Sequence, residues 1–226
     1  MNWIDKGYLI SKSNYNENSV IAEFFTENYG KCSGIIFGAT SKKIKNYLQI
    51  GNKLHINYNY KNEGKTGYFK VEILKANTPL FFDNKKKLSS IISAMQLIKI
   101  LTVESQANKE IFQSIESFFF NLHTKQWLKH YILWELSLFK FLGFDLNLKN
   151  IVNTEVINSK KKYFVKANSI KKDVPNFLVD QKTENIDLST LLSGLNLVTD
   201  YLDKSILKPN NINHPFQRTN FIKILK

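Results

Sequence analysis

The chain of 226 residues has one cysteine, Cys32, and only one arginine, Arg218, among its 32 basic residues. A disulfide needs two cysteines and a cysteine zinc cluster needs several, so both are excluded within this chain. A reducing cytoplasm is the expected location. Arginine supplies the planar fork that reads a guanine edge, whereas lysine binds phosphate as a point charge. We therefore expect any nucleic acid to be held by its backbone with little sequence preference.

Long apolar runs are also missing. No stretch reaches the roughly 20 apolar residues that span a bilayer, and we predict no membrane partner. The N-terminal segment, MNWIDKGYLI, lacks the apolar core of a signal peptide.

The patterns that mark catalytic and metal sites are absent as well. The sequence contains no P-loop, no nucleophile elbow, no paired acidic motif and no nucleophile beside a base. Its four histidines, His55, His123, His130 and His214, lack metal-ligand spacing. We predict a protein that is not an enzyme, with no catalytic residues, no metal and no cofactor.

Positive charge is abundant: the formal net charge is +13 and the pI is about 9.6. Such a balance favours nucleic acid, an anionic membrane or an acidic partner. Because the chain is also crowded with Asn and Ile, an AT-rich genome would favour lysine at any surface position. The places where lysines cluster are therefore more informative than their total.

The first third of the chain predicts a small β-barrel. Leu54, Ile56, Tyr58 and Tyr60 alternate with polar residues, which is the period of a half-buried strand. A turn is expected at 14–18, another at 61–64, and a lysine-bearing connector at 41–45. The predicted strands cover 4–13, 20–25, 34–39, 54–60 and 68–73. Five strands suit an OB-fold, although an SH3-like barrel fits the count nearly as well.

The period changes after Pro79, and the remainder predicts helices. Gly143 and Asp187 supply a helix stop and an N-cap. Residues 148–175 give a poor signal, with a short strand possible at 163–165. The predicted helices cover 88–101, 111–122, 127–142, 188–206 and 215–225. The expected fold is α+β: an N-terminal five-stranded OB-fold β-barrel over residues 1–79, followed by an α-helical C-terminal domain over residues 80–226.

The candidate nucleic-acid site is the connector after the glycine-flanked strand at 34–39. Lys42, Lys43 and Lys45 are the leading phosphate contacts, and Lys31 and Lys12 are weaker members. The competing interpretation is a solvated basic loop in a lysine-rich protein. The tripeptide Lys85–Lys87 precedes a helix, where cations are disfavoured, so we interpret it and the lysines at 160–162 as solvated flanks.

Aromatic side chains near these lysines could stack on unpaired bases. Phe37 and Tyr47 are the candidates, against the alternative that they pack in the core. Tyr58 and Tyr60 share the face of Leu54 and Ile56, so burial is the favoured interpretation for both.

The order of several short motifs resembles the bacterial recombination mediator RecO over nearly the whole chain. The N-terminal motifs are Trp3-x-Asp5-x-Gly7, Phe24-Phe25-Thr26, Gly38-Ala39-x-Ser41-Lys42-Lys43 and Leu48-Gln49-x-Gly51-Asn52. The later ones are Trp134-Glu135-Leu136-x-Leu138, Leu142-Gly143-Phe144-x-Leu146-x-Leu148 and Pro215-x-x-Arg218.

The resemblance implies an OB-fold followed by a helical domain. It also implies a DNA repair and homologous recombination mediator that binds single- and double-stranded DNA and anneals complementary strands. The implied partners are RecR, the C-terminal tail of the single-strand DNA-binding protein and, indirectly, RecA, in a nucleoid-associated cytoplasmic location.

The chain departs from that family in two ways. Several members carry a cysteine zinc site beginning at the position of Ile151, whereas no cysteine follows here, so we expect ordinary packing or loop. Many relatives have arginine after the glycines, where this chain has lysine, so bidentate phosphate geometry is in doubt. The competing functions are an RNA-binding OB-fold protein and a non-catalytic interaction adaptor.

Overall fold

The computed structural model describes residues 2–60, 66–157, 160–167 and 170–226, and the turn predicted at 61–64 lies outside them. The chain forms two compact units, Met1–Ile115 with His214–Lys226, and Glu116–Asn213. This division falls within a helix, α3 (Lys109–Asn121). The division into domains at Pro79 remains a prediction.

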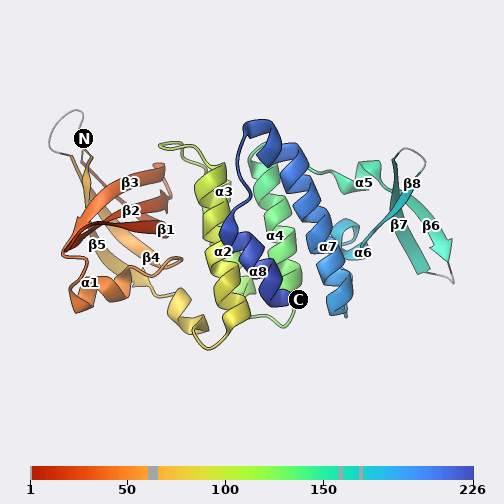
Figure 1. Ribbon diagram of the computed structural model, residues 1–226, viewed down its shortest axis with the longest axis horizontal. Helices are drawn as coiled ribbons and strands as arrows, with labels where there is room; N and C mark the ends of the chain where they lie inside the picture. The colour runs from red at the N-terminus through yellow and green to blue at the C-terminus, as the bar shows by residue number, and fades with distance from the viewer. Residues whose placement is uncertain (1, 61–65, 158–159, 168–169) are drawn as a thin grey trace. The chain divides into compact units, whose positions relative to one another are not determined.

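The first unit contains a closed five-stranded barrel with the strand order β1-β2-β3-β5-β4, shown in Figure 1. All neighbours are antiparallel except β3 and β5, which meet in parallel at Ile35 and Tyr68. The strands are β1 (Trp3–Asn16), β2 (Ser19–Thr26), β3 (Gly30–Phe37), β4 (Lys53–Asn59) and β5 (Tyr68–Lys75). The predicted OB-fold barrel followed by helices is confirmed.

The barrel closes because β1 pairs with two strands, β4 and β2. Its first half pairs with β4, from Trp3 opposite Tyr58, and its second half pairs with β2. Register shifts after Leu9 and Asn14 interrupt the β1–β2 ladder, and such irregularities let a strand bend. The strand continues to Asn16, so the turn predicted at 14–18 is confined to the two residues between β1 and β2.

The barrel interior is filled by alternating side chains, as the period of two predicts. Leu54 and Ile56 of β4 are fully buried, together with Leu9, Phe24 and Phe69. A helix, α1 (Lys42–Tyr47), lies between β3 and β4 where the sequence predicted an irregular connector. Its six residues are too few to give a clear helical period, and its helical state depends on contacts with the barrel.

Four further elements complete the first unit. A 3-10 turn, η1 (Thr78–Phe81), leads into α2 (Lys85–Leu101), which packs against β1 and the last helix, α8 (Phe216–Leu225). The start of α3 also belongs here. The Asn84 side chain caps α2 by accepting from the amide of Lys87, so Lys85–Lys87 form its first turn rather than preceding it.

The second unit is mostly helical but includes a small sheet that the sequence did not predict. Three antiparallel strands in the order β6-β7-β8 occupy the region of poor signal. The middle strand, β7, contains the single short strand predicted at 163–165. The elements are α4 (Trp127–Phe141), α5 (Leu148–Ile151), β6 (Asn153–Ile157), β7 (Lys160–Ala167), β8 (Ile170–Val174), α6 (Asn176–Val179), α7 (Leu188–Tyr201), the π-helical turn η2 (Leu202–Leu207) and the 3-10 turn η3 (Lys208–Asn210).

Helix ends in this unit follow the expected chemistry. Gly143, just beyond α4, has a φ of +87°, a conformation that glycine adopts without a steric penalty. The Asp187 carboxylate accepts from the amide and hydroxyl of Thr190 and so caps α7. Among the described residues, no helix is both long and apolar enough to cross a membrane.

Candidate nucleic-acid interface

The helix α1 presents its lysines outward because its apolar side chains are fixed inward. Ile44 and Tyr47 are three residues apart, on one helical face, and both pack against the barrel core next to buried Leu48. Lys42, Lys43 and Lys45 lie on the remaining surface and are exposed. The Ser41 hydroxyl accepts from the Ile44 amide and begins the helix.

A buried asparagine anchors the end of α1. Asn52 is fully buried, and its side-chain amide donates to the Tyr47 carbonyl at 3.1 Å, while its oxygen accepts from the Thr78 amide at 3.2 Å. Asn77 adds a bond to the carbonyl of Gly51. Because buried polar groups are costly unless paired, this network fixes where α1 ends against the barrel.

Lys12 lies beside the C-terminal end of α1. Much of its side chain is exposed, but its ammonium is partly buried where it donates to the Leu48 carbonyl. Its pKa is lowered by partial burial and, secondarily, by the charge of Lys45. Two ammonium groups are thus close enough to repel each other, and an anion bound between them would relieve that repulsion.

A cavity of about 500 Å³ opens between α1 and the β1–β2 hairpin. Lys12 and Lys45 line it, together with Tyr15, which is 55% exposed, and Glu17, which contributes a negative charge. The structure therefore brings Lys12, Lys42, Lys43 and Lys45 to one end of the barrel. We call these four residues the α1 lysine cluster.

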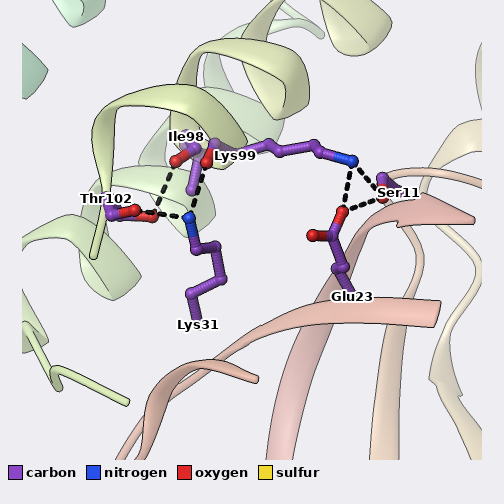
Figure 2. Close-up of polar contacts among 6 residues, drawn as sticks. All are labelled: Ser11, Glu23, Lys31, Ile98, Lys99 and Thr102. Carbon is purple, nitrogen blue, oxygen red and sulfur yellow. Dashed lines mark hydrogen bonds and ion pairs between the residues drawn. The ribbon is translucent and has the colours of Figure 1, made fainter. Parts of the chain in front are cut away.

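Lys31 is placed differently. Its ammonium donates to the carbonyl of Lys99 at 2.8 Å and to that of Thr102, both at the C-terminal end of α2 (Figure 2). A cation at this end of a helix satisfies unpaired carbonyls and complements the helix dipole. Lys31 is thus engaged in holding α2, and its role as a DNA contact remains a prediction.

The same interface contains a second lysine pointing the other way. Lys99 of α2 reaches the barrel, where its ammonium contacts the Glu23 carboxylate and the Ser11 hydroxyl (Figure 2). Burial alone would raise the pKa of Glu23, but hydrogen bonds from Lys99 and Ser11 and the charges of Lys99 and Lys31 hold it below its ordinary value.

The predicted aromatic contacts differ in exposure. Phe37 is 58% exposed, and its ring centroid lies 5.9 Å from that of Tyr68 on β5. The ring of Tyr47 packs against the barrel core instead. Tyr58 and Tyr60 are half-buried rather than enclosed.

Tyr15 and Tyr68 were not identified from the sequence. The sequence could have identified Tyr68, because it directly precedes Phe69, which faces the barrel interior. Alternation along the strand therefore places Tyr68 on the solvent-facing side of β5.

Cys32 is poorly suited to nucleophilic chemistry. Burial, with a smaller effect from the Glu104 carboxylate, raises the pKa of its thiol to about 11, so little thiolate forms at neutral pH. The thiol lies 3.4 Å from the Tyr29 carbonyl.

Within the described ranges, no group of three or more His, Cys, Asp or Glu side chains is arranged to hold a metal ion.

Comparison with known proteins gives matches along most of the chain. Residues 1–77 match the family model described as "Recombination protein O N terminal", and residues 84–210 match "Recombination protein O C terminal". Curated proteins called "DNA repair protein RecO" are similar. The relative from Rickettsia canadensis is 33% identical over 69% of this chain, and the one from Wolbachia pipientis of Culex pipiens is 30% identical over 69%.

The matched part spans 64% of the length of each of those two relatives. A third, from Rhodospirillum centenum, is 22% identical over 98% of this chain and 94% of its own length.

Proposed function

This chain belongs to the RecO family of recombination proteins, and from that membership we propose that it acts in DNA repair and homologous recombination. In this proposal it binds single- and double-stranded DNA, anneals complementary strands, and assists the loading of RecA together with RecR. It performs these steps without catalysing a covalent reaction, in the cytoplasm at the nucleoid.

The α1 lysine cluster is the observation that carries the proposal. Four lysines from β1 and α1 lie at one end of the barrel, and three of them lie on a helix that contains no acidic residue. Point charges of this kind bind phosphates irrespective of sequence. Neutralising the phosphates of one strand would lower its repulsion of a second strand and so favour pairing between the two.

Aromatic residues would complement the lysines. Phe37, exposed beside Tyr68, offers a ring on which an unpaired base could stack, a contact worth about 1–3 kcal/mol. Stacking does not depend on base identity, which suits a protein that must bind any repaired sequence.

The C-terminal tail of the single-strand DNA-binding protein is the partner proposed for the helical part of the chain.

DNA binding measured across a salt series tests the proposal. We expect wild type to bind both single-stranded and duplex oligonucleotides, with a steep loss of affinity as salt rises. Lys42→Glu/Lys43→Glu should lower the slope of log affinity against log salt by about 2 for duplex DNA, or roughly 0.9 per lost phosphate contact.

Lys204→Glu/Lys208→Glu is the matched control, since it makes the same charge change at exposed lysines in the second unit. An equal loss in both variants would assign the effect to net charge and not to α1. A wild type that binds matched RNA more tightly than DNA would favour an RNA-binding function instead, and absence of binding would favour an adaptor.

A further inference from the structure

The mouth of the barrel, at the end of β4 and the start of β1, holds a stack of three aromatic rings. The indole of Trp3 lies between Tyr29, at 4.3 Å between ring centroids and 13° between planes, and Tyr58, at 4.9 Å and 22°. Phe69 contacts the Tyr58 ring at 5.2 Å, which leaves Tyr29 at the outer end of the stack. Parallel stacking of this kind is the geometry by which proteins also hold nucleobases.

An open cavity of about 360 Å³ adjoins this stack. Its volume falls in the range of about 300–1,000 Å³ that is usual for small-ligand pockets, which often occur in the mouths of β-barrels. Trp3, Tyr29, Tyr58 and Tyr60 line it, and all four are half-buried. We call it the mouth cavity.

The segment that follows α2 forms another part of the wall of the mouth cavity, through Glu104 and Ser105. The Ser105 amide donates to the Lys31 carbonyl at 2.8 Å, and Glu104 forms a β-bridge with Lys31. Gly30 lets this segment approach closely, because a Cβ there would lie 2.0 Å from the Gln106 carbonyl oxygen. Ser105 has a φ of +59°, a strained value for a residue other than glycine. The wall is therefore held in place by the barrel.

The described lining of the mouth cavity carries a charge opposite to that of the α1 lysine cluster. Among the described residues that line it, none is a lysine, and Glu104 contributes a carboxylate. This carboxylate would repel a phosphate. A neutral planar ring would be accepted, and a carboxylate hydrogen-bonds well to an exocyclic amino group such as N4 of cytosine.

We propose that the mouth cavity binds one unpaired nucleobase of a bound strand, stacked on the aromatic wall, with Glu104 favouring bases that carry an exocyclic amino group. This inference rests on the proposed function, because the lysines would supply the phosphate contacts that bring the strand to the barrel. It adds a base-dependent contribution to binding that is otherwise electrostatic.

The test compares three short single-stranded oligomers of equal length: oligo-dC, oligo-dT and an abasic chain with the same phosphates. Wild type should bind oligo-dC about tenfold more tightly than the abasic chain. Tyr29→Ala should lower this ratio to the part that stacking on Phe37 supplies, while leaving affinity for the abasic chain unchanged. Phe82→Ala, at a 54% exposed aromatic in the same unit, is the control and should keep the ratio.

Glu104→Gln tests the amino-group preference separately. Wild type should prefer oligo-dC over oligo-dT by about fivefold, and the variant should bind the two equally, since a glutamine amide can pair with either base. A wild type that binds oligo-dC and the abasic chain equally overturns the base site. Because the abasic chain reports phosphate contacts alone, that result would leave phosphate binding by the α1 lysine cluster standing, although it would also exclude stacking on Phe37.

Cys32 provides a second measurement that needs no substitution. It is the only cysteine in the chain and lines the mouth cavity. Its alkylation by N-ethylmaleimide, measured at alkaline pH because little thiolate forms at neutral pH, should be slower with saturating oligo-dC than with the saturating abasic chain. Equal rates under the two conditions would contradict occupation of the mouth cavity by a base.

Discussion

Two glycines that flank β3 have the same backbone conformation in different surroundings. Gly30 has a φ of +66° and Gly38 a φ of +69°. A Cβ at Gly30 would collide with the Gln106 backbone, whereas a Cβ at Gly38 would meet no atom within 4 Å. The first glycine is required for close packing, and the second only for its turn.

This difference predicts unequal costs of substitution. Gly38→Ala should lower the free energy of unfolding by about 1 kcal/mol, since it adds only the strain of a left-handed conformation. Gly30→Ala should cost about 3 kcal/mol or more, because backbone must also move. Urea denaturation of both variants measures the difference, and equal losses would show that the contact with Gln106 is not constrained as described.

Single residues also show what a sequence can reveal about the site. Lys42, Lys43 and Lys45 could be identified because they are neighbours in sequence and therefore stay close together whether the segment is a loop or a helix. The stack of Trp3 on Tyr58 could not be identified in this way. It depends on the closure of the barrel, which pairs the start of β1 with the end of β4.

At the scale of elements, α2 is held to the barrel by polar contacts that should respond to pH. Glu23 has a pKa below its ordinary value of 4.5 in the folded protein. The stabilisation that this shift represents is present above pH 4.5 and is lost as pH falls through the lower, folded-state pKa.

Glu23→Gln should therefore lower the free energy of unfolding by about 1 kcal/mol at pH 7. The deficit should shrink below pH 4.5, where the wild-type carboxylate also loses its charge. Thermal or urea unfolding across pH measures both values. Glu72→Gln, at an exposed position on β5, is the matched control and should stay close to wild type. A deficit that is constant with pH would contradict the role of the Glu23 charge.

Elements were predictable where their signals are local. The alternation of β4, the Gly143 stop and the Asp187 cap each follow from a few adjacent residues. The sheet β6–β8 was missed because lysines occupy half of the eight residues of β7. Phe164 of β7 and Val174 of β8 are buried, but two such residues give no clear alternation. The helix α1 was missed because Asn52 and the barrel surface define it, and neither contact is visible in its own six residues.

At the scale of the whole molecule, the second unit has packed strands in the region where the family resemblance raised the question of a cysteine zinc site. The antiparallel ladder of β6, β7 and β8 supplies backbone hydrogen bonds there, and Phe164 and Val174 are buried. We therefore predict that no metal is needed to order this part of the chain.

Chelation should consequently leave the protein intact. We expect the thermal unfolding midpoint and the affinity for DNA to be unchanged by excess EDTA, because chelators denature only domains whose folding energy includes metal binding. Added zinc should likewise give no stabilisation. A lower midpoint in EDTA that zinc restores would reveal a metal site.

Strand annealing by the whole protein tests the central claim most directly, namely that the α1 lysine cluster holds DNA for pairing. The rate of pairing between complementary fluorescent oligonucleotides would be measured for wild type, Lys42→Glu/Lys43→Glu and Lys204→Glu/Lys208→Glu over a salt series. We predict that wild type and the control accelerate pairing at low salt, and that the α1 variant loses about nine-tenths of this acceleration. Annealing by the α1 variant at the wild-type rate, with the same salt dependence, would contradict the account.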